Sequence, residues 1–257
     1  DWRHWTLMCW LALVTHPLLD ALTIYGTQFG LPFTDHPFGT GSVFVLDPAY
    51  TLPVLLGLVA ALVLPRHGRL GRRLNLAGLA IGTAYLAFGL VAQQLVQHHA
   101  RGELARQGLP ADRLFATPTP LNGVLWRVVA LSGDRYCEGF RSLLDGDAPL
   151  RMRCHDRDVD LLAPLAGSWA AERLRWFTKG WYAAARVHVA ESGRPGVVFR
   201  DLRMGQEPNY VFSFLLADLV DGRTVPRVPE VQVALPPGGR NLGWVWRRIA
   251  DPSLPPP

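Results

Sequence analysis

The stretch Thr15-His16-Pro17-Leu18-Leu19-Asp20-Ala21-Leu22-Thr23-Ile24-Tyr25-Gly26-Thr27-Gln28 closes an apolar segment that begins near Trp5. Between Trp5 and Ile24, His16 and Asp20 are the only side chains of the His, Asp, Glu, Lys or Arg type. Residues four apart on a helix lie on one face, about 40° apart around the axis. An imidazole and a carboxylate on successive turns can hold one divalent metal ion, and zinc suits such ligands.

Two interpretations of this pair stay open. In the first, His16 supports a local hydrogen-bond network while Asp20 bonds Thr23 or the backbone that follows. In the second, the pair binds metal, which the setting favours, because an ionised carboxylate in a membrane helix costs about 2.5–3.5 kcal/mol on insertion scales. The sequence therefore predicts that His16 and Asp20 are metal ligands.

The composition predicts a membrane part joined to a water-facing part. The chain has 257 residues, of which 49% are hydrophobic, and its mean hydropathy is +0.12. The net charge is +5, but Lys179 is the only lysine and the arginines are spread along the chain. A nucleic-acid partner would require a concentrated basic surface, so we expect none.

Three apolar segments in the first part predict about three membrane spans. They are Trp5–Ile24, Tyr50–Leu64 with a broken or re-entrant beginning at Asp47-Pro48, and Leu74–Val96. Only the first and third approach the roughly 20 residues that a span requires. In the third, Gly78 and Gly82 either let a neighbouring helix approach closely or lie scattered on a lipid-facing surface.

The loops predict how the protein lies in a bacterial inner membrane. Residues 65–73 contain four arginines, whereas the loop from Gly26 to Leu46 has no Lys or Arg. Because positive loops stay in the cytoplasm, we expect residues 65–73 there and the C-terminal part outside. Cys137 and Cys154 can pair if their domain faces an oxidising compartment, whereas we expect Cys9 to contribute only to packing.

The second half predicts an α+β domain with a small antiparallel sheet and one helix against it. We place the membrane-embedded helical region at 1–98 and the water-facing domain at 99–257. Strand-like runs cover 124–131, 135–144, 181–189, 197–204 and 210–219, and helical spacing covers 163–178. Residues 101–113 are expected to form a charged helix or linker. The proline-rich end from Leu235 is expected to be an irregular tail, with Trp244 and Trp246 at the bilayer interface.

Further residues are candidates for the site. Asp47 either supplies a third oxygen ligand, and so a catalytic group, or caps a helix beside Pro48. His36 is either a ligand or general base, or an exposed loop residue. Arg203 either forms an ion pair with Asp201 on a solvated strand or binds an anionic head group. The remaining substrate-binding candidates are polar residues of the opening stretch: Thr23, Tyr25, Thr27 and Gln28.

The opening stretch also resembles the bacterial membrane-bound metal-dependent hydrolase family, an inner-membrane family formerly filed as a domain of unknown function. The resemblance rests on His16-Pro-Leu-Leu-Asp20-x-x-Thr23-x-Tyr25-Gly-Thr-Gln28 and on 42–53, with shorter matches at 118–122, 126–127, 176–177 and 201–203. A His-Arg-x-x-Thr-His element that such proteins carry on a preceding helix does not occur in this sequence, which leaves the ligand set open.

The resemblance implies a metal site, and the interfacial position favours an ester or phosphoester of a lipid as substrate. In this hypothesis a divalent ion, expected to be zinc, lowers the pKa of a bound water toward about 7. The alternative is a non-catalytic membrane protein in which the His16–Asp20 pair is structural and the outer domain binds a partner.

Overall fold

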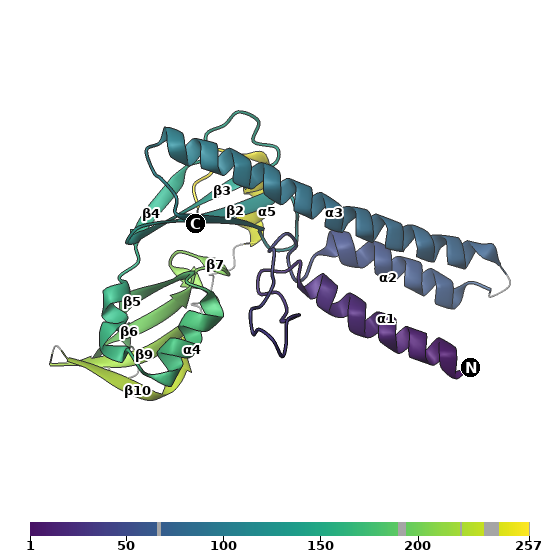
Figure 1. Ribbon diagram of the computed structural model, residues 1–257. Helices are drawn as coiled ribbons and strands as arrows, with labels where there is room; N and C mark the ends of the chain where they lie inside the picture. The colour runs from purple at the N-terminus through teal and green to yellow at the C-terminus, as the bar shows by residue number, and fades with distance from the viewer. Residues whose placement is uncertain (66–67, 190–193, 222, 234–241, 257) are drawn as a thin grey trace.

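The computed structural model describes residues 1–65, 68–189, 194–221, 223–233 and 242–256. Helices α1 (Trp2–Asp20), α2 (Pro48–Val63) and α3 (Arg69–Arg106) come first in the chain. Figure 1 shows α1, α2 and the first half of α3 on the same side of a β-rich domain. This arrangement confirms a helical N-terminal part followed by a domain of antiparallel sheets.

Among the described residues, α3 is the one helix long and apolar enough to cross a membrane. Helix α2 has 16 residues, which corresponds to about 24 Å at 1.5 Å per residue and falls short of a typical hydrocarbon core. Polar residues at both ends shorten the apolar part of α1. The structure therefore supports one clear span and not the three that we predicted.

Helices α2 and α3 approach closely along a row of glycines. A Cβ atom on Gly78 would lie 2.3 Å from the carbonyl oxygen of Pro53, and one on Gly82 would lie 2.8 Å from Val54. Since no larger residue fits at that distance, the prediction that this glycine pair accommodates a neighbouring helix is confirmed.

Helix α3 continues well past the predicted end of the third span. It runs without a break to Arg106, so residues 101–106 of the expected charged helix or linker at 101–113 belong to α3. Its second half packs against the first sheet through Ala92, Val96 and Ala100, which are buried with Trp126 and Val128. One helix thus belongs to both the membrane part and the β domain.

The first sheet is an antiparallel meander of four strands in the order β1-β2-β3-β4. The strands are β1 (Arg113–Pro118), β2 (Leu125–Ser132), β3 (Arg135–Ser142) and β4 (Met152–Asp156). Strand β2 is buried from Leu125 to Leu131, because α3 covers one of its faces and α5 together with the second sheet covers the other. This double burial explains its nearly continuous apolar sequence.

The second sheet has the order β10-β9-β6-β5. Its strands are β5 (Tyr182–Val189), β6 (Arg194–Asp201), β9 (Ser213–Val220) and β10 (Arg223–Gln232). The 3₁₀ helix η1 (Val159–Leu165) and helix α4 (Trp169–Thr178) cover one face. A short hairpin, β7 (Gly205–Gln206) and β8 (Asn209–Tyr210), extends toward the first sheet. The expectation of a single small sheet was therefore wrong, because β1, β4 and β10 complete two sheets.

The C-terminal region departs from the expected irregular tail. Residues Leu242–Ala250 form helix α5, and the Trp244 ring packs against Phe140 with ring centroids 4.8 Å apart. Trp244 is therefore a core residue and not an interfacial one, whereas Trp246 is exposed. The beginning of the predicted tail, 235–241, lies outside the described residues, as do 66–67 of the arginine-rich loop and 191–193 of the turn before β6.

Candidate functional site

His16 and Asp20 lie in the last turns of α1. The His16 side chain is exposed and Asp20 is half-buried. The Thr23 hydroxyl donates to the Asp20 carbonyl oxygen at 2.7 Å and lies 3.4 Å from the Asp20 carboxylate. In the described part of the chain, no group of three or more His, Cys, Asp or Glu side chains is close enough to share a metal ion. The metal-ligand role of the pair stays a prediction.

Asp47 is buried and serves as the N-cap of α2, which is one of its two predicted roles. One carboxylate oxygen accepts the backbone N–H of Ala49 at 3.0 Å, and the other accepts the Tyr85 hydroxyl at 2.6 Å. Asp47 therefore joins the start of α2 to α3. Its proposed second role, as a metal ligand or catalytic group, stays a prediction, although both oxygens already have protein donors.

The loop that follows α1 uses its polar residues to hold its own shape. Thr27 and Phe38 exchange backbone hydrogen bonds at 2.9 and 2.8 Å, and the Gln28 amide donates to the Asp35 carbonyl oxygen at 2.7 Å. His36 is exposed, with its ring 5.1 Å from that of Phe38. These contacts give Thr27 and Gln28 structural roles beside the substrate-binding ones we predicted.

Tyr25 and Arg203, two predicted substrate-binding residues, are far apart in the sequence but lie in contact in the structure. The guanidinium carbon of Arg203 lies 4.5 Å from the centre of the Tyr25 ring and 4.8 Å from that of Phe177. The rings of Tyr25 and Phe177 stack at 5.3 Å. The segment after α1 is thereby attached to the β domain.

Asp201 and Arg203 form a buried ion pair. Arg203 donates through Nε to Oδ1 at 2.9 Å and through Nη2 to Oδ2 at 2.6 Å, and both side chains are buried. The expected solvated strand surface was therefore wrong, since Tyr25 and Phe177 cover the pair. Burial, followed by the charge of Asp201, raises the pKa of the Tyr25 hydroxyl, so this group stays protonated.

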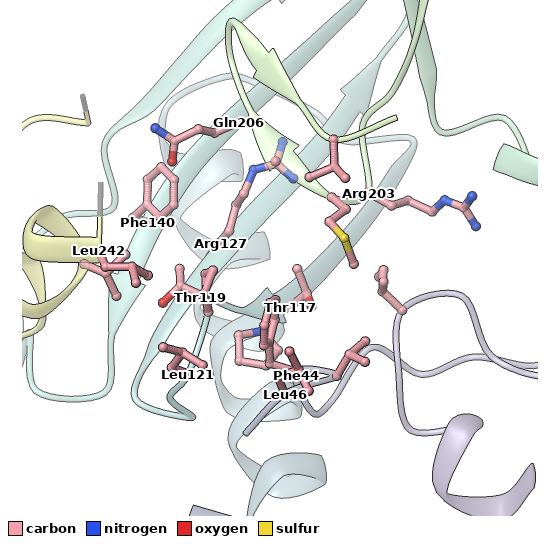
Figure 2. Close-up of a pocket in the computed structure, with 18 of the residues that line it drawn as sticks. Phe44, Leu46, Thr117, Thr119, Leu121, Arg127, Phe140, Arg203, Gln206 and Leu242 are labelled. Atoms are coloured by element: carbon pink, nitrogen blue, oxygen red, sulfur yellow. The ribbon is translucent and has the colours of Figure 1, made fainter. Parts of the chain in front are cut away.

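An apolar cavity of about 540 Å³ lies beside this junction, where the helices meet the β domain. Figure 2 shows Phe44, Leu46 and Leu121 at the bottom of the view and Gln206 at the top, with Thr117 and Thr119 between them and Phe140 and Leu242 to the left. The Phe44 and Leu46 side belongs to residues 43–46, which lead directly into α2. The cavity is therefore placed at the level where α2 begins.

Arg127 and Arg203 are the charged residues of this cavity wall. The Arg127 guanidinium donates to Glu138 Oε2 through Nε at 3.1 Å and Nη2 at 2.6 Å, and through Nη1 to the Leu202 carbonyl oxygen at 2.7 Å. In Figure 2 the Arg203 side chain points away from the other labelled residues. Both arginines thus have carboxylate partners, and the lining is mostly apolar.

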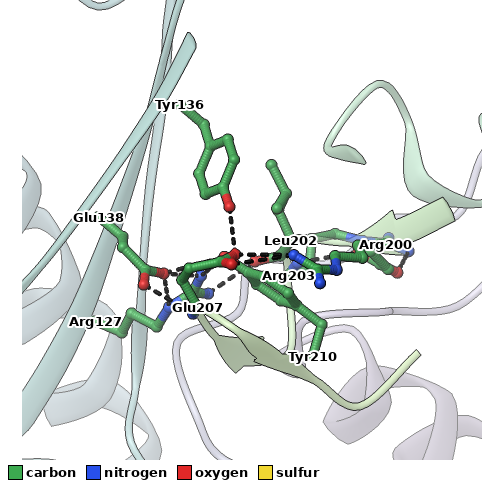
Figure 3. A network of polar contacts seen from close by, with 9 residues as sticks. Arg127, Tyr136, Glu138, Arg200, Leu202, Arg203, Glu207 and Tyr210 are labelled. Carbon is green, nitrogen blue, oxygen red and sulfur yellow. Dashed lines mark hydrogen bonds and ion pairs between the residues drawn. The ribbon is translucent and has the colours of Figure 1, made fainter. Parts of the chain in front are cut away.

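A polar network fixes the β7–β8 hairpin above the cavity (Figure 3). Glu138 accepts the backbone N–H of Glu207 at 2.8 Å and the Tyr210 hydroxyl at 3.3 Å. Glu207 accepts the Tyr136 hydroxyl at 2.6 Å and pairs with Arg200 at 3.0 Å. The network connects both sheets, and it holds the residues of one cavity wall in position.

Few sequence features indicate this cavity. Arg127 is the single charge in the apolar run of β2, and such a residue signals a buried partner, here Glu138 on the neighbouring strand. The remaining lining consists mostly of apolar residues from separate elements. Cys137 and Cys154 face each other on β3 and β4 and form a disulfide, whereas Cys9 is exposed on α1 rather than packed.

The comparisons with known proteins bear on the N-terminal helices. No curated protein and no solved structure matches the chain. A family described as YdjM inner membrane protein matches residues 1–96, which include α1, α2 and most of the apolar part of α3. That description names neither a metal nor a reaction. The helical part of this chain is therefore similar to an inner-membrane family over residues 1–96, in agreement with the expected bacterial inner-membrane location.

Proposed function

We propose that this inner-membrane protein binds an amphiphilic molecule, such as a lipid ester or phosphoester, in the cavity between its helices and its β domain. The observation that carries the proposal is the position of the apolar cavity: residues 43–46 form part of its wall and continue into α2. An apolar cavity with a few polar groups is typical of ligand sites. In this proposal, an acyl chain enters the cavity from the bilayer at the level where α2 begins.

The proposed topology places α1 and α2 in the membrane beside α3, although α2 alone is short. Both helices expose large apolar side chains, among them Leu7, Leu13, Leu56 and Leu62, and contiguous apolar surfaces of this kind signal a lipid or protein neighbour. Arg69, Arg72 and Arg73 begin α3 at the end remote from the β domain. The positive-inside rule then supports a cytoplasmic loop and an outer β domain.

The Cys137–Cys154 disulfide supports the same orientation. Disulfides persist in oxidising compartments such as the bacterial periplasm and are rare in the cytosol. A β domain on the outer side of the inner membrane satisfies this condition.

We further propose that the protein hydrolyses the bound molecule. This step rests on the family resemblance. The described residues do not complete a metal site, because His16 and Asp20 supply two ligands and Asp47 is bonded to Ala49 and Tyr85. No catalytic step through a metal ion follows from this arrangement. Binding without catalysis is the second candidate, favoured by the carboxylate partners of both cavity arginines.

A cavity-filling experiment tests the binding proposal. Gln206→Trp and Thr117→Trp place a large ring in the cavity, whereas Leu144→Trp adds the same ring at an exposed position outside its lining. We expect the first two variants to weaken binding of fluorescently labelled phosphatidylglycerol by about tenfold or more, equivalent to about 1.4 kcal/mol. Equal binding by all three variants and the unmodified protein would contradict the proposal.

A further inference from the structure

The loop after α1 exposes an unusual set of large apolar side chains. Phe33 is 95% exposed, Leu31 58% and Phe29 47%. No charged residue occurs from Ala21 to Thr34, and Asp35 follows at the edge of the loop. We call residues 29–33 the Phe33 loop. Single exposed apolar residues are common on soluble surfaces, but three large ones gathered on a short uncharged loop point to a partner.

The Phe33 loop is ordered by its own hydrogen bonds. The backbone N–H groups of Phe33 and Thr34 both donate to the Gly30 carbonyl oxygen, at 2.7 and 2.9 Å. The Thr27–Phe38 bridge closes the base of the loop. These bonds pair two backbone N–H groups inside the loop, while the side chains of Phe33 and Leu31 are exposed. Pairing of backbone groups within the loop lowers the cost of placing it at the edge of a bilayer, where unpaired backbone groups are costly.

The base of the loop is fixed between the helices and the β domain. The Lys179 ammonium donates to the Pro37 carbonyl oxygen, and the Gly41, Ser42 and Val43 backbone N–H groups bond to carbonyl oxygens of 22–23. Ser42 in turn lies against Gly89 of α3. From Arg73 to Gly89 α3 rises about 24 Å, so this base lies near the outer limit of the proposed membrane region.

We infer that the Phe33 loop inserts into the outer lipid leaflet, at the boundary between head groups and acyl chains. The inference rests on the proposed topology, in which α1–α3 lie in the bilayer. Lipid is the favoured occupant because the loop follows α1 in the chain, and α1, which the proposed topology places in the bilayer, also exposes apolar side chains such as Leu18. Figure 1 shows this segment leaving the end of α1 and projecting away from α3. Trp246, exposed on α5 and close to Pro48 and Ala49, supplies a second aromatic group near the start of α2.

Site-directed probes test this insertion. In a Cys9→Ser background, Phe33→Cys and Leu31→Cys are labelled with an environment-sensitive fluorophore, and the full chain is reconstituted in phosphatidylethanolamine–phosphatidylglycerol vesicles. The control is Ala105→Cys, an exposed residue of α3 about 24 Å beyond Gly89 along the helix. Because Phe33 and Leu31 are exposed, these substitutions leave the packing of the fold unchanged.

We expect nitroxide-labelled lipids to quench the Phe33 and Leu31 probes at least about threefold more than the Ala105 probe, and iodide to show the reverse order. Strong iodide quenching at all three positions would overturn the inference. Protection from both quenchers would also overturn it, because a protein partner or second copy would then cover the loop. The cavity experiment uses other residues and another readout, so failure here is distinguishable from failure of the proposed binding function.

Discussion

Arg203 lies over the ring of Tyr25, with its guanidinium carbon 4.5 Å from the ring centroid, while both of its paired nitrogens bond Asp201. The contact joins the segment after α1 to the β domain. It also places an aromatic residue of the matched N-terminal region against a domain for which no comparison found a relative. The two parts of the chain therefore meet at a specific buried charge.

Tyr25→Ala should destabilise this junction. The ring stacks on Phe177 and contacts Arg203. Removing a fully buried aromatic side chain costs about 3–5 kcal/mol, and because Tyr25 is half-buried we expect a loss of about half that. Tyr25→Phe is the matched control, because the buried hydroxyl makes no hydrogen bond of ordinary geometry. We expect a clear fall in the melting temperature for the first variant only, measured by thermal unfolding in detergent. A substrate-binding hydroxyl would show itself if Tyr25→Phe weakened ligand binding at unchanged stability.

Asp201→Ala should be among the most damaging single substitutions in the β domain. It leaves the Arg203 charge buried without its carboxylate, and breaking such a pair costs about 3–5 kcal/mol. The exposed pair Arg135–Asp156 offers a control, since Asp156→Ala should change stability by less than about 1 kcal/mol. Thermal unfolding measures both variants. If Asp201→Ala and Asp156→Ala lowered the stability equally, burial of the ion pair would not determine how much its loss destabilises the protein.

Gly78→Leu should separate α2 from α3. The new side chain would begin 2.3 Å from the Pro53 carbonyl oxygen, and overpacking of this kind costs about 1–3 kcal/mol or more. At Gly102, in the same helix, a Cβ meets nothing within 4 Å, so Gly102→Ala should be neutral or stabilising by up to about 1 kcal/mol. Yield of folded protein and melting temperature provide the measurement.

Cysteine labelling should place the two ends of α3 on opposite sides of the membrane. In a Cys9→Ser background, a membrane-impermeant maleimide should label Ala105→Cys in intact spheroplasts and Arg69→Cys only after lysis. The basis is the arginine-rich start of α3 together with the disulfide in the β domain. Labelling of both positions from the same side would exclude the proposed topology.

Metal analysis tests the His16–Asp20 prediction directly. If the pair holds a divalent ion, the bound metal of the purified protein should fall to background in both His16→Ala and Asp20→Ala. Asp47→Ala should instead lower stability by about 1 kcal/mol or more, because it removes the N-cap of α2 and the acceptor of the Tyr85 hydroxyl. Unchanged metal content in the first two variants would remove the metal site from the functional hypothesis.

The elements predicted best from sequence are those whose pattern is decided locally. The runs that became α3, β2 and β3 are long or bounded by clear turns, and Asp47-Pro48 is a strong helix-start signal. Strands β1, β4 and β10 were not predicted, because prolines or charged residues interrupt their apolar pattern. They form through pairing with the neighbouring strands β2, β3 and β9. Hairpin pairing, and not local preference, decides these strands.

Individual candidate residues were selected from the sequence, but of these only Arg203 is among the described residues that line the cavity. Tyr25 and Arg203 were both selected as polar candidates, yet their contact depends on Phe177 and on the docking of a loop that no local pattern encodes. Likewise, the hydrogen bond that the Tyr85 hydroxyl donates to Asp47 could not be predicted, because Tyr85 comes from another helix. The cavity itself has apolar walls contributed by several elements, so it appears only when the chain is folded.

The length of α3 has a mechanical consequence. Its 38 residues form one helix about 57 Å long, which exceeds the thickness of a hydrocarbon core of about 30 Å. One end of α3 packs on α2 and the other end packs on the first sheet. The first sheet is therefore coupled to the orientation of α2 and α3. A rotation of α3 in a membrane would therefore also move the first sheet, and the length of α3 sets the distance between the sheet and the bilayer.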